Sequence, residues 1–594
     1  MTTEFEFDLF GRPVVSRWSH GGSSHEIGTE YDALSRPYRI RYPTLADNYQ
    51  LIVRTDFDPI DARASQVVNE TDQMLLRTIA ERDYYDRITA ESRGAIALTN
   101  TFDPVTQRLR HATAMDMSDA NQQTIVDVQY DYYPGGQLQT RTDTSDLGFP
   151  IIETATYDGL SRLATWNVKR GNQPAKTRFY SFNESGTLNA VNDLIGLTNV
   201  GTEAYTYPPS GGPRPHAVET LDDKTFAYDD IGRLASVLQG SDLIRQVNYT
   251  VDNLPRSGTS EGQSFSFLYD AFGRRFQKTT SQGTTTYVGG LYEHRDFGGD
   301  SLHVFYAAGS QLDYRLGDNR AAVSTVVTDG RLGSPIARVD SNGVERFFST
   351  PYGKRIDAVG FDVDEAASSS MMSTGFTSHE HDRILGWTNM RGRIFDPSTR
   401  SFLTPDPVDS VAGRYRYVDH DPFNAIDPSG FQKRNIQSFG RAMRRSADRA
   451  RQTVSDALGV TRSIVAPAPF TGLVIDILVV GSRPSQRPLH FDSSRFWFES
   501  LKNLGPLGIG PGGNTAPPKY PIPTGAPTSS AGGGIWKSAP GTQHRRQDSQ
   551  RRRTQRNMLR NQDPGFHSRN KDAPDKGPDS KIYNLSFSLF RGLG

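Results

Sequence analysis

Carboxylates are the side chains of this sequence with the clearest capacity for chemistry. The chain has no cysteine, which excludes a thiolate nucleophile, a thiolate metal site and a disulfide framework. No His-Glu-x-x-His motif or Cys/His cluster is present, so neither a metal nor a cofactor site is expected. Aspartate precedes proline four times in one short stretch, at Asp396, Asp406, Asp421 and Asp427. Such a carboxylate can act as a general acid or base beside a second one, and otherwise it starts a turn.

A repeated motif precedes these carboxylates and must build the elements that position them. Its clearest copies are YDALSR at Tyr31, YDGLSR at Tyr157, YDDIGR at Tyr228 and YDAFGR at Tyr269. Weaker copies follow Phe7, Tyr130, Phe182, Val251 and Tyr352. A period of roughly 20–30 residues indicates a repeat architecture instead of a series of independent domains.

Each repeat predicts a β-hairpin. The flanking segments, such as TFAYDDIGRLASVLQ, alternate polar with apolar or aromatic residues, as strands do. The Asp-x-x-Gly centre is a turn signature, and the arginine just after it is expected to pair with an acidic neighbour on the next unit. Single hairpins are not stable alone, so the units must pair into a long sheet. The motif residues are therefore expected to be structural: Tyr31, Asp32, Tyr157, Asp158, Tyr228, Asp229, Tyr269 and Asp270.

The formal net charge of zero hides a division near residue 430. The chain through Gly430 carries 41 basic and 57 acidic residues, a net charge of −16. Residues 431–594 hold the other 26 basic and 10 acidic residues, a net charge of +16. Such an asymmetry is typical of an interaction tail or a separate functional unit.

The Tyr-Asp-x-x-Gly-Arg series resembles the YD repeats of the RHS family, which includes bacterial RHS toxins, the C subunits of insecticidal toxin complexes and teneurins. The segment PRPHAV (213–218) resembles a landmark of these repeats. LGWTNMRGRIFDP, TRSFLTPDPV and DPFNAIDPSGF resemble the family's core phrases Ala-Arg-Tyr-Tyr-Asp-Pro, Gly-Arg-Phe-Leu-Ser-Pro-Asp-Pro and Asp-Pro-x-Gly-Leu. The resemblance implies an all-β chain whose hairpins form a long spiralling sheet, a shell or part of one, with repeats over 1–313 and a repeat-associated core over 314–431.

The resemblance also implies that the core is an aspartyl autoprotease. The matching catalytic residues are Asp406 and Asp427, and the cut falls between Phe431, which replaces the family's leucine, and Gln432. Of two adjacent carboxylates one keeps a proton, so one activates water and the other protonates the leaving amine. The alternative is that these Asp-Pro pairs only start turns, as is expected of Asp409, Asp419 and Asp421.

The basic tail carries no recognisable catalytic motif. Residues 432–503 predict a partly helical basic region, 504–543 a Gly/Pro/Ser-rich linker, and 544–594 an arginine-rich segment. The arginines predict either nucleic-acid contact or a solvated, disordered segment. His544 and His567 with Asp563 and Asn570 are candidates for a nuclease site. The family resemblance implies that the tail is cargo enclosed by the acidic part.

Three functions remain open from the sequence. The first is a bacterial polymorphic-toxin shell that encloses its tail and joins other toxin-complex or secretion subunits. The second is an uncleaved structural or adhesive cell-surface protein, and the third is a truncated RHS fragment. The sequence shows neither a signal peptide nor a membrane span, so export by a signal-independent route from the cytoplasm to the cell surface or medium is expected.

Overall fold

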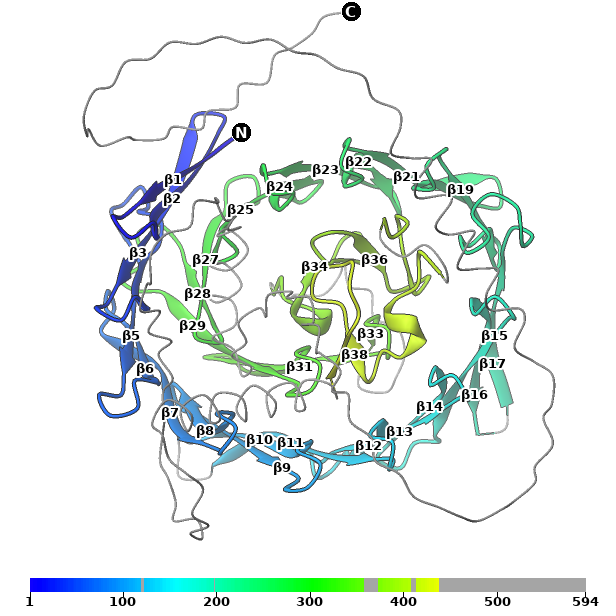
Figure 1. Cartoon of the computed structure of the whole chain (residues 1–594), viewed down its shortest axis with the longest axis horizontal. Helices are drawn as coiled ribbons and strands as arrows, with labels where there is room; N and C mark the ends of the chain where they lie inside the picture. The colour runs from blue at the N-terminus through cyan, green and yellow to red at the C-terminus, as the bar shows by residue number, and fades with distance from the viewer. Residues whose placement is uncertain (119–121, 197, 357–371, 408–412, 437–594) are drawn as a thin grey trace, which may run out of the picture. The chain divides into compact units, whose positions relative to one another are not determined.

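The computed structural model of the chain describes residues 1–118, 122–196, 198–356, 372–407 and 413–436 (Figure 1). The tail beyond residue 436 lies outside the described residues, and so do the helix, linker and arginine-rich segment predicted there. Asp409 and the candidate nuclease residues also fall outside them. No helix in the described ranges has the length and apolar character to cross a membrane.

A single antiparallel sheet dominates the described residues. Its 31 strands follow chain order, since each strand pairs with the next one along the chain from β1 to β31. This confirms the predicted all-β fold of hairpins in one long sheet. The strands are β1 (Thr2–Phe7), β2 (Pro13–His20), β3 (Ser23–Tyr31), β4 (Pro37–Arg41), β5 (Ile52–Phe57), β6 (Ala64–Asn69), β7 (Met74–Arg82), β8 (Ile88–Arg93), β9 (Ile96–Phe102), β10 (Leu109–Asp116), β11 (Gln123–Tyr132), β12 (Leu138–Asp143), β13 (Ile151–Tyr157), β14 (Leu163–Arg170), β15 (Lys176–Phe182), β16 (Leu188–Ile195), β17 (Thr198–Thr206), β18 (Thr220–Leu221), β19 (Lys224–Tyr228), β20 (Leu234–Gln239), β21 (Asp242–Tyr249), β22 (Pro255–Ser260), β23 (Gln263–Tyr269), β24 (Arg275–Thr280), β25 (Gly283–Val288), β26 (Tyr292–Asp296), β27 (Ser301–Ala307), β28 (Ser310–Tyr314), β29 (Ala322–Thr328), β30 (Pro335–Asp340) and β31 (Gly343–Arg346).

Shorter strands follow the long sheet, which itself continues past residue 314 to β31. They form small antiparallel pairs and one sheet of β34 to β37. These elements are β32 (Phe348–Ser349), β33 (Arg355–Ile356), β34 (Glu380–Asp382), β35 (Trp387–Asn389), β36 (Ile394–Asp396), β37 (Ser401–Phe402), β38 (Ala425–Ile426) and β39 (Arg434–Asn435), with the 3₁₀ turns η1 (Phe376–Ser378) and η2 (Val418–His420). We call residues 372–436 the inner region, because Figure 1 shows its strands within the curve of the long sheet.

The turn of each repeat is organised by its aspartate. In the β19–β20 hairpin, the Asp229 carboxylate oxygen Oδ1 accepts hydrogen bonds from the backbone N–H groups of Ile231 and Arg233, at 3.2 and 2.9 Å. Gly232 occupies the left-handed region at φ 91°, which the tight turn requires. A register shift between Ala227 and Tyr228 places the aromatic residue at the end of the first strand. The predicted Asp-x-x-Gly turn is therefore formed by side-chain capping.

The motif arginine corrects one expectation from the sequence. Arg233 pairs with Asp229 of its own turn, Nε to Oδ2 at 2.6 Å, and not with an acidic residue of the next unit. Because the arginine lies four positions after the aspartate across a tight turn, it is close enough to form a local ion pair with it. Its guanidinium then lies 4.8 Å from the ring centre of Tyr249 in the next repeat, as a cation–π contact. Arg233 therefore contacts the next repeat through the Tyr249 ring and through 3.2 Å hydrogen bonds to the Thr250 carbonyl and the Asn253 side chain, and not through an ion pair.

The tyrosine that ends the first strand of a hairpin supplies a second link between repeats. The Tyr249 hydroxyl donates to the carbonyl oxygen of Leu234, the first residue after the preceding turn, at 2.7 Å. Each such bond to a half-buried carbonyl is worth on the order of 1 kcal/mol. The same bond recurs from Tyr31 to Pro13 (3.0 Å), Tyr157 to Leu138 (2.8 Å), Tyr228 to Val218 (3.0 Å) and Tyr269 to Pro255 (2.6 Å). The matching aspartates Asp32, Asp158 and Asp270 cap their turns as Asp229 does.

The first strands of the sheet pack against later ones, so the described sheet curves back upon itself. Phe5 meets Phe272 edge to face, with ring centres 5.9 Å apart. The Tyr42 hydroxyl donates to the Tyr306 carbonyl at 2.7 Å. One buried apolar cluster joins Trp18 to residues of β24–β28. The spiralling course predicted for the sheet is confirmed by these contacts, which we call the seam.

Three histidines lie at the seam. The rings of His294 and His303 stack with centres 4.7 Å apart. The His303 ring shares a 2.7 Å hydrogen bond between its Nδ1 and the Tyr292 hydroxyl. His25 on β3 packs against the same tyrosine. Burial and the neighbouring His294 lower the pKa of His303 to about 4. These rings are therefore packed as neutral groups.

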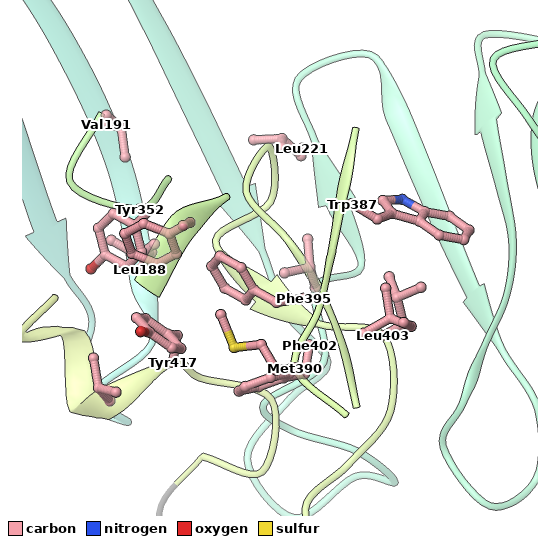
Figure 2. Packing of buried hydrophobic residues seen from close by; sticks show 14 of the residues in the cluster. Leu188, Val191, Leu221, Tyr352, Trp387, Met390, Phe395, Phe402, Leu403 and Tyr417 are labelled. Atoms are coloured by element: carbon pink, nitrogen blue, oxygen red, sulfur yellow. The ribbon is translucent and has the colours of Figure 1, made fainter. Parts of the chain in front are cut away.

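The largest apolar cluster joins the inner region to the long sheet. Figure 2 shows Trp387, Phe395 and Tyr417 of the inner region beside Leu188 and Leu221 of the sheet. All of these side chains are buried. Because the inner region has only short strands, this burial supplies most of what holds it in place.

Buried ion pairs fix the inner region to the sheet at defined points. The Arg245 guanidinium on β21 contacts the Asp396 carboxylate at 2.6 Å, with both side chains nearly inaccessible to water. On β24, Arg275 and Lys278 reach the Asp382 carboxylate at 2.7 and 2.9 Å. Pairs of this kind favour one docking geometry over others, because any shift would leave a charge buried alone.

Candidate functional site

The two predicted aspartates come together in the inner region. Asp406 follows β37, and its backbone N–H donates to the Arg414 carbonyl at 2.8 Å. Asp427 directly follows β38. Their exposed fractions are 6% and 3%. Two residues 21 positions apart in sequence are therefore placed in one buried site by the short hairpins around them.

Arg393 joins the two carboxylates. Its guanidinium nitrogen Nη2 lies 3.0 Å from Oδ2 of Asp406 and 3.7 Å from Oδ2 of Asp427. Nη1 donates to the Arg414 carbonyl at 2.9 Å, and the guanidinium lies 3.7 Å from the ring centre of Phe402. A cation between two carboxylates offsets their mutual repulsion and holds both in place.

Sequence reasoning did not assign a role to Arg393. One signal was present, because this arginine lies in MRGRIFDP, at the place of arginine in the phrase Ala-Arg-Tyr-Tyr-Asp-Pro. Composition and spacing gave no other indication, since the two carboxylates follow it by 13 and 34 residues.

The predicted scissile peptide lies against Asp427. The backbone N–H of Gln432 donates to Oδ1 of Asp427 at 2.9 Å. The Gly430 carbonyl, one residue before the Phe431 carbonyl, accepts a hydrogen bond from Nε of Arg393. The peptide between Phe431 and Gln432 is therefore bounded by a carboxylate at its nitrogen and by a cation next to its acyl side.

Backbone contacts hold the chain before this peptide. The N–H of Gly392 donates to the Ser429 carbonyl at 3.0 Å. Gly430 has φ 77°, and a Cβ there would lie 2.6 Å from the Met390 carbonyl and 2.9 Å from the Arg393 nitrogen. Only glycine allows the two backbones to approach this closely.

The chain beyond the peptide is also held. β39 pairs with β38, and the Ile436 N–H donates to the Asn424 carbonyl at 2.9 Å. The Lys433 ammonium contacts Asp419, which lies in the η2 turn, at 3.1 Å. Asp421 accepts from the Asn424 side chain at 2.7 Å, and burial raises its pKa.

The other predicted residues lie away from this site. Tyr31, Asp32, Tyr157, Asp158, Tyr228, Asp229, Tyr269 and Asp270 belong to the hairpin turns of the long sheet. Within the described ranges, no three histidine or acidic side chains are arranged to hold a metal ion.

The fold is shared with solved toxin complexes. The crystal structure of TcdB2–TccC3 matches with a TM-score of 0.59 at 17% identity, over 72% of this chain and 24% of that chain. A Photorhabdus luminescens Tc holotoxin pore matches with a TM-score of 0.58 at 16% identity, over 73% and 24%. The probable deoxyribonuclease RhsB of Dickeya dadantii is 24% identical over 421 residues, which cover 59% of this chain and 28% of the relative. The chain has an RHS-like fold.

The resemblance inferred from the YD motifs and core phrases is thereby confirmed, and the chain shares its fold with these toxin-complex structures. A second relative, salivary gland surface protein 1 of Aedes aegypti, is 30% identical over 80 residues, 14% of this chain and 2% of the relative. No family model matches the sequence. The RHS-like chain spans less than a third of the length of each of these relatives.

Proposed function

We propose that this RHS-like chain is the shell component of a toxin and that it cuts itself between Phe431 and Gln432. The observation that carries the proposal is the hydrogen bond from the Gln432 amide to Asp427, made at the peptide that the sequence resemblance selects. Asp406 and Arg393 complete the site within 3.0 Å of each other. A turn-forming role alone does not require two buried aspartates to share one guanidinium beside that peptide.

The proposed reaction uses one water molecule and one proton held by the two carboxylates. Asp406 accepts a proton from the water as its oxygen attacks the Phe431 carbonyl carbon. In this step Asp427 holds the proton on the carboxyl oxygen that does not accept from the Gln432 N–H, delivers it to the Gln432 nitrogen, and the C–N bond breaks. The products are a carboxyl group on Phe431 and an amine on Gln432, and the pair again holds one proton. Because the substrate is part of the same chain, its effective concentration is high.

Arg393 supports this reaction by position. Its bond to the Gly430 carbonyl fixes the backbone one residue before the bond that breaks. Its contact with both carboxylates sets their separation. Burial of the site strengthens each of these interactions, since bulk water is largely excluded.

The charge division supports a cargo role for the tail. Residues through Gly430 carry a net charge of −16, and residues 431–594 carry +16. A basic tail is attracted to an acidic partner, which here is the sheet that precedes it in the same chain. Assembly with other toxin-complex subunits and action outside the producing cell belong to the same proposal. The similarity to the TcdB2–TccC3 structure supports the proposed assembly with other toxin-complex subunits.

Electrophoresis of the purified full chain tests the proposal. Cleavage divides the 65.9 kDa chain into pieces of about 48 and 18 kDa, in proportion to their lengths. Asp427→Asn and Asp406→Asn are expected to leave one band. Asp421→Asn is the matched control, because it removes another buried Asp-Pro carboxylate that makes no contact with the scissile peptide in the described structure.

Intact mass of the fragments decides the position of the cut. A new amino terminus at Gln432 supports the proposal. A single full-length wild-type band would overturn it and favour the alternative, an uncleaved structural or adhesive cell-surface protein. Equal cleavage in Asp427→Asn and in wild type would exclude the assigned carboxylates.

A further inference from the structure

Gly392 and Phe431 fit each other in an unusual way. A Cβ added to Gly392 would lie 2.5 Å from Cζ and 2.6 Å from Cδ2 of the Phe431 ring, and closer still to Cε2. Real Cβ atoms do not make such contacts, so the ring occupies the space that any side chain at 392 would need. The backbone at this glycine lies outside the left-handed region, so alanine could adopt its conformation. The ring is therefore the reason why glycine is needed here.

Backbone hydrogen bonds hold Gly392 in place, and the Phe431 ring, which is 38% exposed, packs against it. The Gly392 N–H donates to the Ser429 carbonyl, in the bend between β38 and the cut, at 3.0 Å. It lies in the turn between β35 and β36, which is closed by a 3.0 Å bond from the Met390 N–H to the Arg393 carbonyl. The guanidinium of Arg393 lies 5.6 Å from the ring centre of Phe431. The ring is held between a glycine backbone and a cation.

We propose that Gly392 and Phe431 are a matched pair, in which the absence of a side chain at 392 lets the aromatic residue before the cut take its place in the self-cleavage site. The inference rests on the proposed self-cleavage and names a residue that positions its substrate.

The expected consequence follows from the connection between ring and carbonyl. A methyl group at 392 displaces the Phe431 ring, and the ring moves its own backbone. That shift carries the scissile carbonyl and the Gln432 N–H away from Asp427, to which the amide is bonded at 2.9 Å. Misplacing reacting atoms by about 1 Å costs on the order of 10²-fold in rate. A leucine at 431 has no ring edge at that place and tolerates the methyl group.

Cleavage rates of four full-length chains test the pairing: wild type, Gly392→Ala, Phe431→Leu and the double variant. Each is made by cell-free synthesis and sampled over time on a gel. Gly392→Ala is expected to slow cleavage by about 10-fold or more, and the double variant to regain the rate of Phe431→Leu. The melting temperatures of the same four chains, measured with Asp427→Asn added to keep them intact, are expected to agree closely.

Two results would overturn the pairing alone while leaving self-cleavage in place. One is Gly392→Ala cutting at the wild-type rate. The other is a double variant as slow as Gly392→Ala, which would show that the methyl group acts on something other than the ring. A wild-type chain that is never cut would overturn the proposed function and this inference with it.

Discussion

Removing the Asp382 carboxylate tests whether buried ion pairs dock the inner region. Asp382 and Arg275 have side chains that are each 1% exposed, and their atoms lie 2.7 Å apart. Asp382→Asn keeps the volume but leaves the guanidinium without its main partner. Breaking such a pair costs about 3–5 kcal/mol. Glu380 remains 3.2 Å from the same guanidinium nitrogen, so we expect the lower end, about 3 kcal/mol.

Hydrogen exchange is the suitable assay, because a chain of this size does not unfold in one step. Amides of β34 to β36 are expected to exchange about 100-fold faster in Asp382→Asn, as a 3 kcal/mol loss implies. The matched control is Glu26→Gln, which breaks an exposed pair with Arg17 and should cost less than about 1 kcal/mol. Both changes are made with Asp427→Asn present, so that intact chains are compared.

The same pair predicts how docking responds to acid. Burial opposes ionisation of Asp382, but Arg275 and Lys278 outweigh it and lower its pKa to about 2. A depressed carboxyl pKa contributes stability above the ordinary value of 3.8, and this contribution is lost as the pH falls through about 2. Docking should therefore be unchanged down to about pH 4. The reasoning on the ion pair would be refuted if Asp382→Asn raised amide exchange in β34 to β36 no more than the control Glu26→Gln does.

Three further predictions concern the repeats, the seam and the site. Tyr269→Phe removes the 2.6 Å bond to the Pro255 carbonyl and should destabilise β22–β24 by about 1 kcal/mol, seen as faster amide exchange; unchanged exchange would contradict the hydroxyl link. The lowered pKa of His303 means that the seam is fully stable above pH 6.5 and weakens as the pH falls toward 4, so the protection of the β26–β27 amides, corrected for the pH dependence of the chemical exchange rate, should fall between pH 7 and 5, and less so in His303→Gln. Gly430→Ala forces a Cβ against the Met390 carbonyl and should reduce cleavage on a gel, because it moves the backbone before the cut. Abundant cleavage of this variant would show that the close backbone approach is unnecessary.

Much of the sheet could be predicted, because the repeat carries local information. The turn at Asp229 needs only residues within five positions of one another, and the alternation on either side defines the two strands. The partner of Arg233 was nevertheless predicted wrongly, although it also lies within the turn. Charge patterns in sequence do not show that an arginine four residues after an aspartate folds back onto it across a tight turn.

The candidate site could be predicted only in part. Asp406 and Asp427 followed from a resemblance to known phrases, and nothing in their spacing showed that they meet. The contributions of Arg393 and Gly392 depend on contacts between hairpins that are distant along the chain. The seam between the first strands and β24–β28 is likewise a long-range packing result, since no single repeat encodes it.

The neighbour-to-neighbour order of the long sheet has a consequence for synthesis. Each strand finds its partner in the segment made just before it, so the sheet can form progressively as the chain leaves the ribosome. The inner region is made after the long sheet and docks onto β21 and β24, which by then exist. Under the proposed function, the Gln432 amide reaches Asp427 only when that docking is complete. Cleavage would then occur only in chains whose assembly is complete. A full-length chain whose inner region has not docked would keep its tail attached.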